Sequence, residues 1–126
     1  PIEIYGHGKM YRDFTYIDDI INGIMKVVKK GPLKVSPNNG IRDIPWEIYN
    51  IGNNNTISLE NFIKIIELST EKKAVKNYLD IQPGDMKLTS ANIEKIKNDV
   101  NFYPKTNINE GLLNFVKWYK NFYKIA

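Results

Sequence analysis

The sequence predicts an α/β fold with an incomplete sheet, and three observations support this fold class. Short segments rich in β-branched and aromatic residues alternate along the chain with amphipathic helical patterns. Apolar residues in the helical segments recur at spacings of three and four. Clusters of glycine, proline and asparagine separate the segments. The 126 residues fit one domain at most, and a chain of this length can bury one real core.

The first part of the chain predicts a strand, a glycine turn and a helix. Pro1 to Tyr5 is a short strand that ends at Gly6-His7-Gly8. Acidic residues after Ile17 suit the start of a helix, and Gly31-Pro32 ends it. Residues 31 to 45 then predict an irregular loop. The apolar face of the helix comprises Ile17, Ile20, Ile21, Ile24, Val27 and Val28.

The second part predicts two further strands and three further helices. Trp46 to Ile51 and Val75 to Leu79 are strand-like. Three polar residues are predicted to cap the helices that follow them: Ser58, Ser90 and Asn107, the last within a capping box completed by Glu110. The apolar faces expected for these helices are Leu59, Phe62, Ile63, Ile65 and Ile66, then Ile93 and Ile96, then Ile108, Leu112, Phe115, Val116, Tyr119, Phe122 and Tyr123.

Composition narrows the function classes. A content of 42% hydrophobic and 25% charged residues is that of an ordinary globular protein, and no apolar run approaches the roughly 18 residues of a membrane span. We therefore expect no membrane partner. The net charge of +4 permits an anionic partner, but the lysines are scattered, so we expect solvated helix faces and no nucleic acid. The absence of cysteine permits a cytoplasmic location and excludes thiolate chemistry.

Two motifs near the N-terminus are interpreted as coincidental. Gly6-His7-Gly8 lacks the third glycine and the immediate helix of a dinucleotide fingerprint. Tyr5 and Lys9 have the spacing of a Tyr-x-x-x-Lys dyad, but two glycines between them disfavour the helix that would stack their side chains. His7 is the only histidine, so we expect no histidine-based metal site or catalytic triad.

Arg12 is the residue of greatest interest in the glycine-bounded segment that precedes the first helix. A guanidinium group offers bidentate donors that suit a diphosphate. The alternative is a surface ion pair between Arg12 and Asp13 or Asp18. The residues alone leave both interpretations open.

Four segments in order resemble the extended short-chain dehydrogenase/reductase family acting on nucleotide sugars. They are the stretch YGHGKMYRDFTYIDDI at residues 5–20, Tyr49-Asn50-Ile51-Gly52, Gln82-Pro83-Gly84-Asp85, and the final Phe115-Val116-Lys117-Trp118-Tyr119. The Gln-Pro-Gly-Asp form and the Trp-Tyr ending are most similar to bacterial UDP-glucuronate 4-epimerases of capsule and lipopolysaccharide pathways. The resemblance covers nearly the whole chain.

This resemblance implies that residues 1–126 form the C-terminal substrate-binding region of a Rossmann-type epimerase. The family binds NAD in an N-terminal domain, which also carries the catalytic Tyr-x-x-x-Lys pair, and neither is found here. Because Pro1 begins inside a strand-like segment, we expect a fragment that is inactive alone, with no catalytic, cofactor-binding or metal-binding residue of its own. Residues 46–52 would form an edge strand of the absent domain's sheet.

The same resemblance assigns the substrate-binding residues. Arg12 corresponds to the arginine that contacts the UDP diphosphate, and Asp85 to the acid that accepts hydrogen bonds from the ribose hydroxyls. Glu3 and Tyr5 would meet the uracil through main-chain groups, although the Tyr5 side chain could equally belong to the core. Gln82 replaces the arginine of UDP-galactose epimerases, which favours the glucuronate branch.

Two other functions are open beside UDP-sugar 4-epimerisation. A nucleotide-sugar 4,6-dehydratase or decarboxylase of the same family is one alternative, and a non-catalytic module that binds nucleic acid is another. The resemblance implies a homodimer for the full-length protein. The isolated chain is expected to associate with itself, because its first helix and the Trp46 to Ile51 segment lack their family partner.

Overall fold

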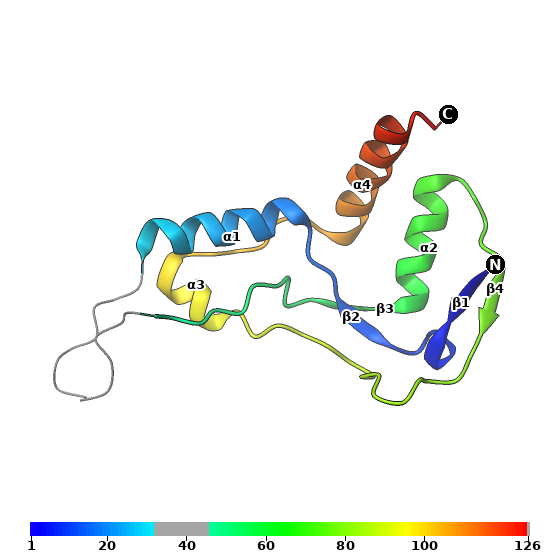
Figure 1. Cartoon of the computed structure of the whole chain (residues 1–126), viewed down its shortest axis with the longest axis horizontal. Coiled ribbons are helices and arrows are strands. Elements are labelled where there is room, and N and C mark those ends of the chain that lie inside the picture. The colour runs from blue at the N-terminus through cyan, green and yellow to red at the C-terminus, as the bar shows by residue number, and fades with distance from the viewer. Residues whose placement is uncertain (32–45, 126) are drawn as a thin grey trace.

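The computed structural model describes residues 1–31 and 46–125, and it confirms a mixed fold of helices and short strands. Figure 1 shows α1 and α3 at one end of the molecule and α2, β1 and β4 at the other, joined by extended segments. In chain order the elements are β1 (Ile2–Ile4), the 3-10 turn η1 (Tyr5–Gly8), β2 (Tyr11–Asp13), α1 (Ile17–Lys30), β3 (Thr56–Ser58), α2 (Leu59–Thr70), β4 (Lys76–Tyr78), α3 (Glu94–Val100) and α4 (Ile108–Tyr123).

Two of the helices begin at the predicted caps. The Ser58 hydroxyl accepts a hydrogen bond from the Asn61 N–H at 3.2 Å, and the Asn107 side chain accepts one from the Glu110 N–H at 3.0 Å. Each bond satisfies one of the free N–H groups of a helix's first turn. Within residues 1–31 and 46–125, no helix combines the length and apolar character needed to cross a bilayer.

The strands form two separate pairs. β1 lies parallel to β4, with Ile2 opposite Lys76 and Ile4 opposite Tyr78. β2 lies antiparallel to β3, and an isolated parallel bridge joins Tyr11 to Leu88 on its other side. The sequence did not predict β2 or β3, because three residues are too few for a period-two pattern to emerge.

The tightest part of the core lies at the end formed by α1 and α3. Ile96 and Phe102 are fully buried and Ile93 is nearly so, with Ile51 packed against them. Gly23 makes this possible, because a Cβ at that position of α1 would lie 3.1 Å from the Phe102 ring. At the other end α2 packs against α4, and Ile63, Ile65, Leu112 and Val116 are buried.

Two sequence predictions need correction. Trp46 to Ile51 forms no strand within the described residues, because no described strand lies beside it to complete a ladder, and Trp46 and Ile48 are exposed. The expectation that residues 46–52 form an edge strand of another domain's sheet stays a prediction. Ser90 does not cap α3. It lies four residues before Glu94, and the Glu94 N–H instead donates to Asn92 Oδ1 at 3.0 Å.

Candidate functional site

Pairing of β1 with β4 brings together two segments that lie far apart in the sequence. The Leu79 N–H donates to the Ile4 carbonyl at 2.9 Å, and the His7 N–H donates to the Leu79 carbonyl at 3.1 Å. The chain then turns at Gln82 to Asp85, where the Asp85 N–H donates to the Gln82 carbonyl. Pro83 followed by Gly84 at φ 89° fits a type II turn, whose third position requires a positive φ. The exposed Gln82 and Asp85 side chains therefore lie next to η1.

Tyr5 lies at the centre of this group. Its side chain is half-buried outside the core, and its hydroxyl donates to Glu3 Oε2 at 2.7 Å. The hydrogen bond to Glu3 is the main reason why the pKa of Tyr5 is raised, followed by partial burial and the negative charges of Glu3 and Asp85. A hydrogen bond with Gln82 acts in the opposite direction on that pKa. Three of the other predicted site residues, Glu3, Gln82 and Asp85, thus act on the Tyr5 hydroxyl.

The main chain of β1 offers a free edge beside these side chains. Ile2 and Ile4 direct their hydrogen-bonding groups toward β4, since the Ile2 N–H reaches the Val75 carbonyl at 2.8 Å and the Ile4 carbonyl accepts from Leu79. Main-chain groups alternate along a strand, so Glu3 directs its N–H and C=O away from β4. No described strand covers that side. A planar ligand with donors and acceptors on one edge could bind there.

Arg12 lies on β2, one residue beyond the bridge to Leu88. Its Nη1 donates to the Tyr11 carbonyl at 2.9 Å, and its Nη2 lies 3.4 Å from the Met10 sulfur. Arg12 pairs with neither Asp13 nor Asp18, so the surface ion pair that the sequence left open is not formed. Its guanidinium keeps donors for an anion.

Asp13 was not predicted as a site residue, and its carboxylate binds main-chain groups instead of Arg12. Its carboxylate accepts main-chain N–H bonds from Asn53 at 3.2 Å, Asn54 at 3.0 Å and Ala91 at 3.0 Å. The Asp13 carboxylate therefore has a structural role, because it holds together two loops that lie far apart in the sequence. Asp13 also lines an open polar cavity of about 450 Å³ together with Tyr49, Asn50, Ser90 and their neighbours.

Gly52 lies where these loops meet. A Cβ at Gly52 would lie 2.3 Å from the Ala91 Cβ and 3.1 Å from Asp13 Oδ2, which leaves no room for a side chain. The glycine in the Tyr-Asn-Ile-Gly motif therefore permits a close approach of two chain segments. In the sequence, the only indication of this close approach is a glycine that follows the strand-like segment.

Asp19 is the second carboxylate with an unpredicted structural role. It is only 5% exposed, and its Oδ2 accepts from the Lys105 N–H at 3.2 Å and the Thr106 N–H at 2.9 Å. These bonds fix the start of α1 to the segment that leads into α4. Within the Asp-Phe-Thr-Tyr-Ile-Asp-Asp stretch, two acids thus bind main-chain N–H groups and neither pairs with Arg12.

The other motifs have the local geometry that the sequence suggested. Gly6 and His7 have φ values of 58° and 51°, so η1 is no α-helix and cannot stack Tyr5 over Lys9. His7 is exposed and contacts Asp80 at 2.9 Å. In residues 1–31 and 46–125, no three acidic or histidine side chains converge as metal ligands would.

Sequence comparison places the chain among known proteins. It is 44% identical to "Protein CapI" of Staphylococcus aureus and 39% identical to a UDP-glucuronate 4-epimerase of Thermodesulfobacterium geofontis. The alignments cover 98% and 95% of this chain, but only 39% and 33% of those two proteins. No protein-family model matches the chain.

A crystal structure of UDP-glucuronic acid 4-epimerase from Bacillus cereus, in complex with UDP-glucuronic acid and NAD, has the same fold. It matches 94% of this chain and 36% of the crystallised one, with a TM-score of 0.73 and 31% identity. These findings confirm the resemblance found in the sequence. The chain is similar to the C-terminal part of UDP-glucuronate 4-epimerases of the extended short-chain dehydrogenase/reductase type.

Proposed function

We propose that this chain is the substrate-binding part of a cytoplasmic, NAD-dependent nucleotide-sugar 4-epimerase. The substrate would be UDP-glucuronate or UDP-galacturonate, and the product would serve surface polysaccharide synthesis. The similarity to CapI and to UDP-glucuronate 4-epimerases supports this reaction. NAD, bound by a domain outside these residues, would accept the C4 hydride and return it to the opposite face of the sugar.

The observation that carries the proposal is the grouping of the predicted residues into two arms. The ribose arm comprises Glu3, Tyr5, Gln82 and Asp85 around η1, where a free strand edge and a carboxylate suit a uracil and a ribose. The diphosphate arm consists of Arg12. Its guanidinium lies against the Met10 sulfur and has donors that suit a phosphate anion. The Gln82–Thr89 segment connects the arms, because the Thr89 N–H donates to the Tyr11 carbonyl next to Arg12.

The two arms predict different losses, and this difference tests the proposal. A charge-assisted contact is worth roughly 1.5–3 kcal/mol, so Arg12→Ala should weaken UDP binding roughly 10- to 150-fold and leave uridine binding nearly unchanged. Asp85→Ala should weaken UDP and uridine binding together by a smaller factor, because it removes hydrogen bonds to neutral hydroxyls. Calorimetric titration of the full chain, with any NAD-binding domain that accompanies it, measures both ligands.

Lys9→Ala serves as the charge control, because it removes an exposed cation next to η1 that belongs to neither arm. Its effect on UDP affinity should stay below about twofold. If Arg12→Ala binds UDP like the wild type, or no more weakly than Lys9→Ala does, the diphosphate assignment is wrong.

The reaction class is tested separately. The chain alone should not convert UDP-glucuronate, whereas the protein joined to its NAD-binding domain should form UDP-galacturonate of identical mass. Mass spectrometry distinguishes this outcome from dehydration or decarboxylation, since each of those reactions lowers the mass of the product. Activity of the chain alone would refute the assignment of catalysis to another domain.

A further inference from the structure

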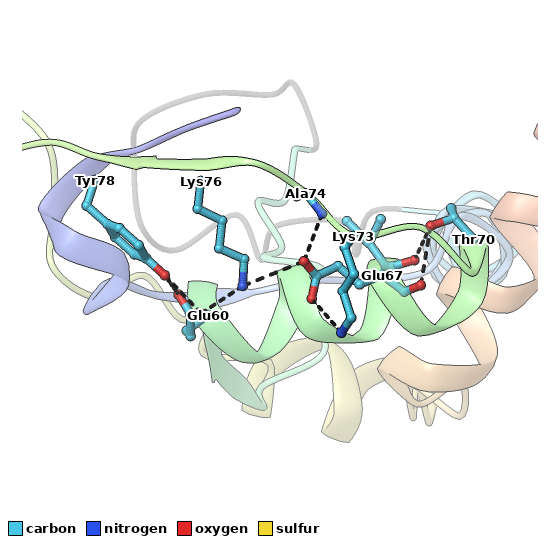
Figure 2. A network of polar contacts seen from close by, with 8 residues as sticks. Glu60, Glu67, Thr70, Lys73, Ala74, Lys76 and Tyr78 are labelled. Atoms are coloured by element: carbon cyan, nitrogen blue, oxygen red, sulfur yellow. Dashed lines mark hydrogen bonds and ion pairs between the residues drawn. The ribbon is translucent and has the colours of Figure 1, made fainter. Parts of the chain in front are cut away.

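One acidic side chain of α2, Glu60, contacts β4 and η1, the two elements next to the arms of the proposed site. Its Oε1 accepts a hydrogen bond from Lys76 Nζ at 3.0 Å, and Tyr78 Oη lies 3.2 Å from each of its carboxylate oxygens. Figure 2 shows Lys76 and Tyr78 reaching from β4 toward this carboxylate on α2. Glu60 therefore fixes β4 to the start of the helix.

The same carboxylate supports the glycine turn. Gly8 is buried at φ 73°, and a Cβ there would lie 2.9 Å from Glu60 Oε2. The absence of a side chain at Gly8 lets η1 lie directly on Glu60. The residue before Glu60 strengthens this contact, because the Leu59 N–H donates to the Met10 carbonyl at 2.8 Å.

Each contact leads to one arm. Through Tyr78 and the following Leu79, Glu60 holds the segment that carries Gln82 and Asp85. Through Gly8, Glu60 supports η1, and the adjacent Leu59 N–H holds Met10, whose sulfur contacts the Arg12 guanidinium. We propose that Glu60 is a positioning residue that sets the spacing between the ribose arm and the diphosphate arm. This inference rests on the proposed function.

A spacing role makes a distinctive prediction about ligands. UDP would contact both arms at once, and its affinity depends on their spacing, as for any linked pair of contacts. Uridine and inorganic pyrophosphate would each contact one arm, so their affinities do not depend on that spacing. Loss of Glu60 should therefore lower the affinity of UDP relative to the affinities of uridine and pyrophosphate.

The experiment measures the affinities of UDP, uridine and pyrophosphate for wild type and Glu60→Ala by calorimetry on the full chain, as above. Substitutions that alter coupling between sites change it by about 0.5–2 kcal/mol, so UDP affinity should fall roughly 2- to 30-fold. The affinities of uridine and pyrophosphate should change by less than about twofold. Glu60→Gln keeps an amide oxygen for Lys76 and Tyr78 and should restore most of the UDP affinity.

Glu67→Gln is the matched control on the same helix. Glu67 contacts Lys73, Ala74 and Lys76 but neither Tyr78 nor η1, so this variant should lower thermal stability and leave the UDP-to-uridine ratio unchanged. If Glu60→Ala does not fold, Tyr78→Phe removes one hydroxyl at the same contact and should lower the ratio by a smaller factor.

Two results would overturn the spacing role: an equal loss for UDP and uridine in a folded Glu60 variant, or no loss at all. A wild-type protein that shows no preference for UDP over uridine would instead refute the proposed function.

Discussion

The two ends of the molecule are stabilised in different ways and expose different chemistry. At the helical end, formed by α1, α3 and residues 46–52, Ile96 and Phe102 are fully buried, yet the outer face of α1 is apolar. At the ligand end, formed by β1, η1, β2, α2 and β4, Ile4, Ile63 and Ile65 are buried as well. Ion pairs and main-chain bonds also hold the three-residue strands of this end together. The exposed apolar residues of α1 are Ile17, Ile21, Ile24, Met25 and Val28.

The difference indicates what each end can bind. An apolar helix face gains free energy only against another apolar surface, so the helical end suits a protein partner. An open strand edge with an arginine that forms no ion pair within residues 1–31 and 46–125 suits a small polar anion. In this protein the candidate site therefore lies at the end with the open strand edge, and the apolar helix face lies at the other end.

Removing the core aromatic of the helical end should have the largest effect. Phe102→Ala should lower the free energy of unfolding by about 3–5 kcal/mol, because it leaves a cavity beneath Gly23 and Ile96. Urea titration measures the change. Phe115→Ala, at a half-exposed position on α4, is the control and should have a much smaller effect. Comparable losses would show that Phe102 does not dominate the core.

Loss of the Asp13 carboxylate tests the connection between the two ends. Asp13→Ala leaves three main-chain N–H groups without their acceptor and should lower the free energy of unfolding by about 2–3 kcal/mol. It should also weaken UDP binding, because β2 carries Arg12 as well. Asp18→Ala, at an exposed position on α1, should change neither quantity. Normal UDP affinity in a destabilised Asp13→Ala protein would show that the two ends are independent.

The apolar face of α1 should cause the isolated chain to associate with itself. Ile21 is 50% exposed at the middle of this face, and Ile21→Lys should weaken association roughly tenfold or more. Sedimentation measures the dimer fraction across concentrations. The exposed Lys64→Ala on α2 is the control at the ligand end. A wild-type chain that stays monomeric at high concentration would contradict the prediction.

Acid should produce the smallest effect, and it should act mainly at the ligand end. The pKa of Glu67 is lowered, first by the Ala74 N–H bond and then by the charges of Lys73 and Lys76. A lowered pKa in the folded state contributes stability above the ordinary value of 4.5, and this stability is lost as pH falls further. Figure 2 shows the contacts concerned. Melting temperature should therefore fall below pH 4.5, and the fall should be shallower in Glu67→Gln.

The helical end contains a weaker counterpart of Glu67. The pKa of Asp99 is lowered, first by the Tyr49 hydroxyl and then by Lys30, but its side chain is 32% exposed, compared with 8% for Glu67. Solvent screens such a contact, so Asp99→Asn should change the fall in melting temperature at low pH less than Glu67→Gln does. The reverse order would contradict the assignment of acid sensitivity to the ligand end.

The sequence by itself determined the parts of the protein that depend on local patterns. Apolar spacing predicted α1, α2 and α4, since a helix face is set by residues within a few turns of one another. Ser58 and Asn107 were recognised as caps because the bonds they make reach only three residues ahead. Ordered motifs also indicated the protein class and the residues of the candidate site, all of which remain predictions about binding.

Only the tertiary structure decided which polar side chains form hydrogen bonds to distant main-chain groups. Asp13 and Asp19 resemble surface acids in the sequence, but they bind main-chain groups roughly 40 to 90 residues away in the chain, which no local pattern encodes. Trp46 to Ile51 has strand-like residues but no neighbour, and a strand exists only where a second strand completes its hydrogen bonds. Glu60 resembles any helix-surface acid until β4 and η1 are folded over it, because its role arises from contacts between segments.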